Sequence, residues 1–357
     1  MKIAILNNIP TKYRKDLFLG LQKFHLRQGN KFSVYYLSAN EKVRNEKISL
    51  EQYEHIFPVI VQFRNFLTPT SDFIINYNFI NKLLSYDYLI IFGYNYPTYI
   101  VIAVIRRILK KKNILYCDTT SIDSKNNLIK IFLKSLILRS LFNKFIVPGI
   151  RSNQYINSLK IYDNIFIAPQ YSPLRPKSFE IKEKILKDKL KLVYVGRLAR
   201  EKQILNFVEI FNKVNNQKFE LAIVGSGPLQ KNIEKFCYDN KSIKYLGYIH
   251  DDNKLVKIYK ESDILVLPSL SEPWGLVVNE AINHGLALLL SDQVGSHPDL
   301  LDGNGLLIHE ISEKELKKCL NSFLKNLKVM QEKSFKISLK YKRENQIYGF
   351  NKTLGIN

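Results

Sequence analysis

The chain has 357 residues, which is too many for one ordinary domain and suggests about two. A hydrophobic share of 46% excludes a disordered, collagen-like or disulfide-scaffold protein. Three scattered cysteines, Cys117, Cys237 and Cys319, show no Cys-x-x-Cys spacing, which argues against a structural zinc site. The opening MKIAILNN is typical of a buried strand rather than of a secretory signal, so we expect a cytoplasmic protein.

The formal net charge is +22, and most of the excess lies in the first half of the chain. Residues 1–175 contain 25 basic and 10 acidic side chains. Such a basic field attracts nucleic acid, anionic lipid head groups or phosphorylated ligands. AT-rich codons would give the same excess, because they favour the abundant Asn, Ile, Lys and Tyr, so both explanations stay open.

Apolar runs alternate with helical patterns along the whole chain, which is typical of βαβ units and parallel sheets. Runs such as LVYV and ELAIV lack period-two alternation, which indicates strands buried on both faces. The predicted strands are Lys2–Asn7, Phe32–Leu37, Tyr88–Phe92, Asn113–Tyr116, Lys144–Val147, Leu192–Val195, Phe219–Val224, Ile243–Leu246, Ile264–Pro268 and Ala287–Ser291. Two doubly wound α/β domains fit this pattern better than one large sheet.

The domain boundary is predicted near the proline-containing, highly charged segment from Tyr171 to Leu190, which reads as a linker and a surface helix. We therefore expect a first domain over 1–172 and a second over 173–340. The chain is expected to be helical and Lys-rich from about Glu313 onward, and its helical tail over 341–357 is expected to pack back on the first domain.

Two apolar segments raise the question of a membrane. Residues 89–105 are interrupted by a glycine and a proline and are short for a span of about 20 residues, so we expect a strand, a turn and a helix there. Residues 128–146 carry Lys130, Lys134, Arg139 and Lys144 at near-helical spacing in an apolar background. They predict either a basic amphipathic helix on an anionic bilayer or a core-facing helix with solvated lysines outside.

A first candidate anion site follows the strand that ends at Gly196. Arg197 and Lys202 lie in the turn that leads into the next helix. Such a turn gathers unpaired backbone N–H groups beside a positive helix end, and two cations would add partners for phosphate oxygens. The same two residues could equally be ordinary solvated side chains.

The next strand ends in IVGSGPLQ, where Gly225 and Gly227 permit a tight turn with close backbone approach. Gln230 stands at the third glycine position of the dinucleotide-binding fingerprint. The pattern therefore disfavours a nicotinamide-dependent dehydrogenase.

The most informative segment is SDILVLPSLSEPWGLVVNEAINHG, in which a buried strand leads into a helix near Gly275. Glu272 precedes the helix and Glu280 lies inside it, about 7.5 Å along the axis from Gly275. Free N–H groups of Gly275, Leu276 and Val277 would hold a phosphate, and Glu280 would accept hydrogen bonds from ribose hydroxyls. The alternative is a helix with an acidic first turn and one solvated glutamate.

These motifs together resemble the C-terminal half of the family-4 retaining glycosyltransferases (glycosyl transferases group 1), which have the GT-B fold. The matching segments are GRLAREK (Gly196–Lys202), VGSGP (Val224–Pro228), YLGYI (Tyr245–Ile249) and the long segment Ser262–Gly295. The resemblance implies an α/β protein of two Rossmann-like doubly wound domains facing across a cleft, with the sugar nucleotide mostly against the second domain.

The resemblance also implies roles for single residues. These are Arg197 and Lys202 at the diphosphate, Glu280 at the ribose, Glu272 at the donor sugar, and Tyr248 and Ile249 at the border of the base. No metal is expected, because the Asp251–Asp252 pair is not an Asp-x-Asp motif. The nucleotide-diphosphate sugar would be a co-substrate, and no further cofactor is implied.

The first half matches the family less fully. NNIPTKYRKDLFLGL (Asn7–Leu21) resembles a subset with a Pro-x-x-Tyr-Arg loop, but the usual paired glycines are absent, so Tyr13 and Arg14 could reach into the cleft instead. Asp118 falls where many members have a histidine or an acidic residue at a strand end. It is a candidate for positioning or for base chemistry.

The implied reaction is retaining hexosyl transfer to a saccharide or lipid-linked saccharide acceptor, as in capsule or lipopolysaccharide assembly. A basic first domain suits a lipid-diphosphate acceptor at the inner membrane surface. One alternative is a GT-B-fold sugar-nucleotide epimerase, which would need no acceptor. Another is a basic nucleic-acid-binding protein, which the two carboxylates beside the cationic pair disfavour, so we expect no nucleic acid partner.

Overall fold

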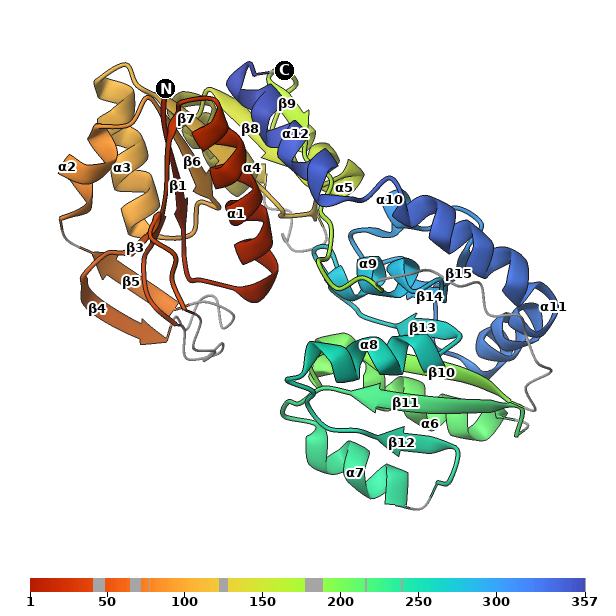
Figure 1. Ribbon diagram of the computed structural model, residues 1–357. Coiled ribbons are helices and arrows are strands. Elements are labelled where there is room, and N and C mark those ends of the chain that lie inside the picture. The colour runs from red at the N-terminus through yellow and green to blue at the C-terminus, as the bar shows by residue number, and fades with distance from the viewer. Residues whose placement is uncertain are drawn as a thin grey trace. The chain divides into compact units, whose positions relative to one another are not determined.

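The computed structural model describes residues 1–356 except 41–48, 65–71, 77, 122–127, 177–188, 216 and 239. The chain divides into two compact units (Figure 1). Unit 1 consists of residues 1–119, 125–169 and 343–357, and unit 2 of residues 120–124 and 170–342. The sequence predicts boundaries at 172 and 340, and the units divide at 169 and 342. Most of the predicted linker and surface helix, 177–188, lies outside the described residues.

Unit 1 is built on a parallel sheet with the strand order β3-β2-β1-β6-β7-β8-β9. Its strands are β1 (Lys2–Asn7), β2 (Lys31–Tyr36), β3 (Glu54–Ile56), β6 (Tyr88–Phe92), β7 (Lys112–Tyr116), β8 (Lys144–Val147) and β9 (Ile165–Ile167). Residues 3–6 of the central strand β1 are fully buried, which explains why their sequence shows no polar alternation. A separate antiparallel pair joins β4 (Val59–Arg64) and β5 (Asp72–Asn76).

The helices of unit 1 connect and cover these strands. They are α1 (Lys12–Arg27), α2 (Phe79–Leu84), α3 (Pro97–Ile108), α4 (Leu128–Leu141), α5 (Ile150–Ser158) and α12 (Arg343–Leu354). The last of them, α12, comes from the C-terminus and packs against α1, β8 and β9 (Figure 1). Arg343 at its start forms an ion pair with Asp16 of α1, Nη1 to Oδ1 3.1 Å.

Unit 2 has a second parallel sheet with the order β12-β11-β10-β13-β14-β15. Its strands are β10 (Leu190–Val195), β11 (Phe219–Val224), β12 (Ile243–Tyr245), β13 (Ile264–Leu267), β14 (Ala287–Ser291) and β15 (Gly305–Ile308). Its helices are the 3-10 turn η2 (Arg200–Lys202), α6 (Ile204–Val214), α7 (Gln230–Tyr238), α8 (Asp252–Glu261), α9 (Leu276–Asn283), α10 (His297–Leu300) and α11 (Glu313–Ser338). The long helix α11 packs on α6, α9 and β14.

Each sheet reverses its strand order at one point: between β1 and β6 in unit 1, and between β10 and β13 in unit 2. In open parallel sheets, ligands bind beyond the carboxyl ends of the strands at such a point, because the loops there diverge and leave room. These two edges are therefore where a site is sought in each unit.

Candidate functional site

Two loops meet at the switch point of unit 2. Strands β10 and β13 pair in parallel, with Leu192 opposite Ile264, so the loops that follow both strands leave the same edge of the sheet. A hydrogen bond from the Leu270 N–H to the Glu201 carbonyl oxygen, 2.8 Å, ties the two loops together. The predicted diphosphate ligands thus share one edge with the segment that contains Glu272.

Lys202 and Glu272 form an ion pair across these loops. The Lys202 Nζ lies 2.8 Å from Glu272 Oε2 and 3.0 Å from the carbonyl oxygen of Ser271. Their side chains are only 15% and 20% exposed. The partly buried position strengthens the interaction compared with a surface pair. Two predicted site residues are therefore in direct contact.

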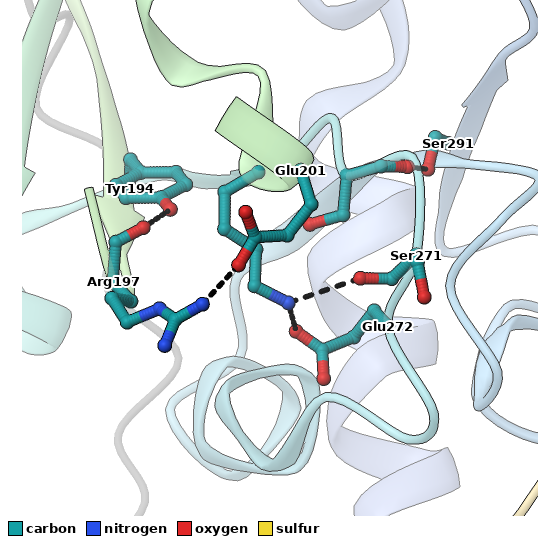
Figure 2. Close-up of polar contacts among 8 residues, drawn as sticks. Tyr194, Arg197, Glu201, Ser271, Glu272 and Ser291 are labelled. Carbon is teal, nitrogen blue, oxygen red and sulfur yellow. Dashed lines mark hydrogen bonds and ion pairs between the residues drawn. The ribbon is translucent and has the colours of Figure 1, made fainter. Parts of the chain in front are cut away.

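Arg197 is paired separately, with Glu201. Figure 2 shows the Arg197 side chain directed toward Glu201, while the Tyr194 hydroxyl donates to the Arg197 carbonyl oxygen at 2.9 Å. Burial acts to raise the pKa of Glu201, but the hydrogen bond from its own backbone N–H and the nearby Arg197 guanidinium outweigh burial and lower the pKa below its ordinary value. Glu201 is a polar partner that the sequence reasoning missed. The sequence did contain a signal for this ion pair, because Glu201 follows Arg197 by four residues and has the opposite charge.

The backbone around Glu272 is held by the loop after β14. The Glu272 N–H donates to the Gln293 carbonyl oxygen at 3.3 Å, and the Gly295 N–H donates to the Glu272 carbonyl oxygen at 2.7 Å. A Cβ added at Gly295 would lie 1.8 Å from the Pro273 carbonyl oxygen, so only glycine allows this approach. Ser291, also labelled in Figure 2, donates to the Ser269 carbonyl oxygen at 2.5 Å. The Glu272 carboxylate is consequently presented from a fixed loop.

The mouth of α9 lies next to this loop. Gly275 is the N-cap residue at φ +85°, and a Cβ there would lie 3.1 Å from the Glu272 Cγ. Between described residues, no hydrogen bond uses the N–H groups of Gly275, Leu276 or Val277, whereas the Val278 N–H donates to the Gly275 carbonyl oxygen. Three N–H donors at the positive end of a helix are suited to an anion.

Glu280 lies one turn further along α9. Its Oε2 accepts from the Tyr259 hydroxyl at 2.7 Å, and its Oε1 from Ser172 Oγ at 3.3 Å. Burial raises the pKa of Glu280 to about 7, although these two hydrogen bonds act in the opposite direction. A ribose at this carboxylate would have to share its oxygens with two protein hydroxyls. The predicted ribose contact stays a prediction.

The glycines after β11 have an internal structural reason. A Cβ at Gly225, at φ +140°, would lie 1.8 Å from the Gly196 carbonyl oxygen. A Cβ at Gly227, at φ +156°, would lie 2.5 Å from the Leu198 carbonyl oxygen. The predicted close backbone approach is therefore made to the neighbouring Gly196–Leu198 loop, which it positions at the sheet edge.

The residues predicted at the border of the base follow β12. The Tyr248 side chain is 48% exposed and meets the His250 ring edge-on at 4.5 Å, and Ile249 packs partly buried against the core. Asp251 caps the start of α8, where its Oδ1 accepts from the Asn253 N–H at 2.8 Å.

Unit 1 has a polar cluster at its own switch point. Arg14 lies 3.6 Å from Asp118 Oδ2 (measured from Nη2), donates to Asn7 Oδ1 at 2.5 Å and covers the Phe92 ring at 4.7 Å. Asn7 and Phe92 end β1 and β6, so this cluster joins the two strands at the reversal. Asp118 is 46% exposed. It belongs to unit 1, whereas the other predicted site residues belong to unit 2.

Two further observations concern metals and membranes. Within the part of the chain that the structure describes, no three His, Cys, Asp or Glu side chains gather in a way that could hold a metal ion. None of the described helices combines the length and the apolar character needed to cross a bilayer.

Comparison with known proteins adds a family signal to this geometry. Residues 177–336 match the model of the family described as "Glycosyl transferases group 1". An uncharacterized glycosyltransferase of Methanocaldococcus jannaschii is 30% identical over 128 residues, which cover 34% of this chain and 32% of that protein. The O-antigen biosynthesis glycosyltransferase WbnH of Escherichia coli is 30% identical over 155 residues, which cover 43% of this chain and 44% of WbnH. The match thus spans less than half the length of either relative.

Among solved structures, Anabaena HepE in complex with UDP superposes with a TM-score of 0.74 at 15% identity, covering 99% of this chain and 100% of HepE. At this identity the likeness shows the fold alone. It agrees with the two parallel sheets described above, and the predicted fold class is confirmed. The chain is an α/β protein with two Rossmann-like domains, its structural neighbours are GT-B glycosyltransferases, and its residues 177–336 match glycosyl transferases group 1.

Proposed function

We propose that this protein is a retaining glycosyltransferase that moves a hexosyl group from a nucleoside-diphosphate sugar to a saccharide or lipid-linked saccharide. The observation that carries the proposal is the Lys202–Glu272 ion pair beside the three N–H donors at the start of α9. A lysine and a helix N-terminus suit a diphosphate, and a fixed carboxylate suits the hydroxyls of a sugar. The match of residues 177–336 to the family model supports the same reaction class.

In the proposed reaction, the bond between the anomeric carbon and the diphosphate oxygen breaks, and the diphosphate keeps the electron pair. Lys202 and the N–H groups of residues 275–277 stabilise this charge, a contribution that often amounts to about 10²–10³ in rate for one donor. Arg197 adds a second cation when it leaves Glu201. The acceptor oxygen bonds to the anomeric carbon on the same face, and its proton passes to an oxygen of the departing diphosphate.

The remaining predicted residues have supporting roles in this proposal. Glu280 accepts from the ribose hydroxyls, and Tyr248 and Ile249 border the base. Gly225 and Gly227 hold the Gly196–Leu198 loop at the diphosphate. Asp118 of unit 1 positions the acceptor. We propose that no metal takes part, since the Asp251–Asp252 pair lacks the Asp-x-Asp pattern.

We place the reaction in cell-surface polysaccharide synthesis, at the cytoplasmic face of the membrane. The name of the relative WbnH, an O-antigen biosynthesis glycosyltransferase, supports this setting. The complex of the structural neighbour HepE with UDP makes uridine nucleotides the first donors to test.

Calorimetric titration with UDP, followed by NMR analysis of the product formed from UDP-sugars, tests the proposal. Replacing Lys202 by Met should weaken UDP binding by roughly tenfold to a hundredfold, the usual effect of losing a charged hydrogen bond. Lys257→Met is the matched control, because Lys257 is also ion-paired but its side chain is 78% exposed. A product of inverted configuration would contradict retention, and an altered sugar nucleotide formed without acceptor would indicate an epimerase. If folded protein binds none of the UDP-, GDP-, ADP- and dTDP-sugars, the proposal is wrong.

A further inference from the structure

Helices α3 and α4 of unit 1 lie in contact, and the Arg107 Nε donates to the Ser140 carbonyl oxygen at 2.9 Å. Both helices expose large apolar side chains. On α3 and its C-cap these are Val101 (43% exposed), Val104 (38%), Ile108 (73%) and Leu109 (52%), and on α4 they are Phe132 (64%), Leu133 (50%), Leu136 (59%) and Ile137 (46%). We call these eight residues the α3–α4 surface.

The pattern on α4 shows that this exposure is not the ordinary outer face of a crossover helix. Its inner side is already occupied, since Ser135, Leu138 and Leu141 are buried. From the sequence, solvated lysines could cover the outer side of α4. Of the basic residues of α4 whose side chains are described, Lys134 donates to the Tyr155 hydroxyl at 3.1 Å and Arg139 is exposed among apolar side chains that face the solvent. A helix that is apolar on both sides needs a second apolar environment.

Helices α3 and α4 contain basic but no acidic side chains, although Arg106 of α3 is buried. Residues 97–117 contain five basic and no acidic side chains, and residues 128–162 contain six basic and no acidic ones. Lys110 and Arg139 are exposed beside the apolar residues. Apolar side chains that can enter a bilayer, with basic groups that meet lipid phosphates, are the combination that binds peripheral proteins to anionic membranes.

We propose that the α3–α4 surface docks on an anionic phospholipid bilayer, with Ile108, Phe132 and Leu136 entering the head-group boundary. A second copy of this chain is a poorer occupant, because a twofold interface sets the same surface against itself and would bring the basic rims together. This proposal does not depend on the proposed glycosyl transfer, whose donor site lies in unit 2.

Cosedimentation of the full chain with vesicles tests it. We expect binding to vesicles of equal parts phosphatidylcholine and phosphatidylglycerol at about 0.1 M salt, and much less to pure phosphatidylcholine. At about 0.5 M salt, where the screening length is about 4 Å, binding should fall steeply. The double variant Lys110→Asn/Arg139→Gln should lose about fivefold in partition coefficient for each removed charge. Equal binding to both vesicle types, or none to either, would overturn the proposal.

A matched pair of variants tests the apolar part. Ile108→Ser/Phe132→Ser/Leu136→Ser should lose vesicle binding at least tenfold. The control Leu26→Ser/Tyr238→Ser/Val329→Ser removes apolar side chains that are 58%, 92% and 55% exposed on other faces, and it should bind as the wild type does. Equal loss in both triple variants contradicts the docking surface. The proposal is also contradicted if the wild type binds no vesicles but self-associates, and the first triple variant abolishes that self-association.

Fluorescence then reports insertion directly. The single natural tryptophan, Trp274, is buried in unit 2 and gives a constant background. Phe132→Trp should shift its emission to shorter wavelength with anionic vesicles and be quenched by brominated lipid, whereas Leu26→Trp should not change. An unchanged Phe132→Trp spectrum at saturating vesicles excludes insertion at this surface. UDP binding, measured on the same preparations, separates this outcome from a failure of the proposed enzymatic function.

Discussion

Lys202 and Glu272 are separated by 70 positions in the chain, yet their charged atoms lie 2.8 Å apart. The contact exists because β10 and β13 are neighbours at the switch point, although they are far apart in sequence. In this structure the lysine is neutralised by a carboxylate. A diphosphate that binds there must compete with Glu272 for Lys202, so binding and rearrangement of this pair are coupled.

Stability measurements can show how strongly this pair is coupled. Lys202→Met leaves the Glu272 carboxylate four-fifths buried without its cation, so the free energy of unfolding should fall by about 1–3 kcal/mol. Adding Glu272→Gln should recover part of that loss. Urea unfolding of the four proteins in a double-mutant cycle gives the coupling. Additive effects would show that the two side chains act independently.

The titration of Glu280 should make the stability of the protein fall, and its affinity for a nucleotide rise, as the pH increases. Its pKa in the folded protein is raised by burial to about 7, from an ordinary value of 4.5. Between these pH values the unfolded chain releases the proton and the folded chain keeps it, so stability falls as the pH rises and the penalty is complete above about 7. Glu280→Gln should therefore stabilise the protein by an amount of order 2 kcal/mol at about pH 8 and by little near pH 4.

The same titration should appear in UDP affinity. A ribose hydroxyl that donates to Glu280 favours the ionised carboxylate, so affinity should rise with pH through about 7. Glu280→Gln should bind more weakly and without this rise, as calorimetry at several pH values would show. A wild-type affinity that does not change across this range would argue against a ribose at Glu280.

The loop after β11 can be tested through its glycines. At Gly225 a Cβ would meet the Gly196 carbonyl oxygen at 1.8 Å, so Gly225→Ala should reduce stability by about 2–4 kcal/mol. Gly29 also has a positive φ, +67°, but nothing lies within 4 Å of an added Cβ. Gly29→Ala should therefore show only the backbone penalty of about 1 kcal/mol. Similar losses in thermal or urea unfolding would contradict the close approach of the two loops.

His25 predicts sensitivity to acid. It is fully buried between the rings of Phe24 and Phe32, and among the described residues neither ring nitrogen has a hydrogen-bond partner. Burial, with the N-terminal ammonium, lowers its pKa from 6.5 to about 4. The unfolded chain then takes up the proton first, so up to about 3 kcal/mol of stability is lost as the pH falls from 6.5 to 4. His25→Phe should flatten this part of the stability profile.

The predicted strands are all present in the structure, because strands buried on both faces leave long apolar runs in the sequence. The strands that the sequence did not reveal are short or irregular. β9 (Ile165–Ile167) and β3 (Glu54–Ile56) have three residues each, and β15 (Gly305–Ile308) begins at a glycine. β4 and β5 form a separate antiparallel pair whose register shifts between Val59 and Val61. Their pairing depends on a neighbouring strand rather than on a pattern of their own.

The candidate site was predictable in its residue types and only partly in its contacts. The arrangement of Glu272 and Glu280 around Gly275 could be predicted from the sequence, because the start of one helix, α9, positions both residues. The pairing of Arg197 with Glu201 was signalled only by their four-residue spacing, which predicts a contact on a continuous helix, whereas Arg197 precedes the 3-10 turn η2. The exposed apolar side of α4 was hidden for a similar reason, because the sequence shows an apolar helix but not which of its sides is covered.

The return of α12 to unit 1 has a consequence for how the protein is made. Phe350 of α12 is fully buried and stacks on Phe92 and Tyr116, at 6.0 and 5.8 Å between ring centres. Because Phe350 follows all of unit 2 in the chain, unit 1 cannot complete its packing until the residues of unit 2 have been synthesised. Unit 1, which is begun first, is thus completed after unit 2, and a nascent chain arrested before Arg343 would leave uncovered the ring faces of Phe92 and Tyr116 on which Phe350 stacks.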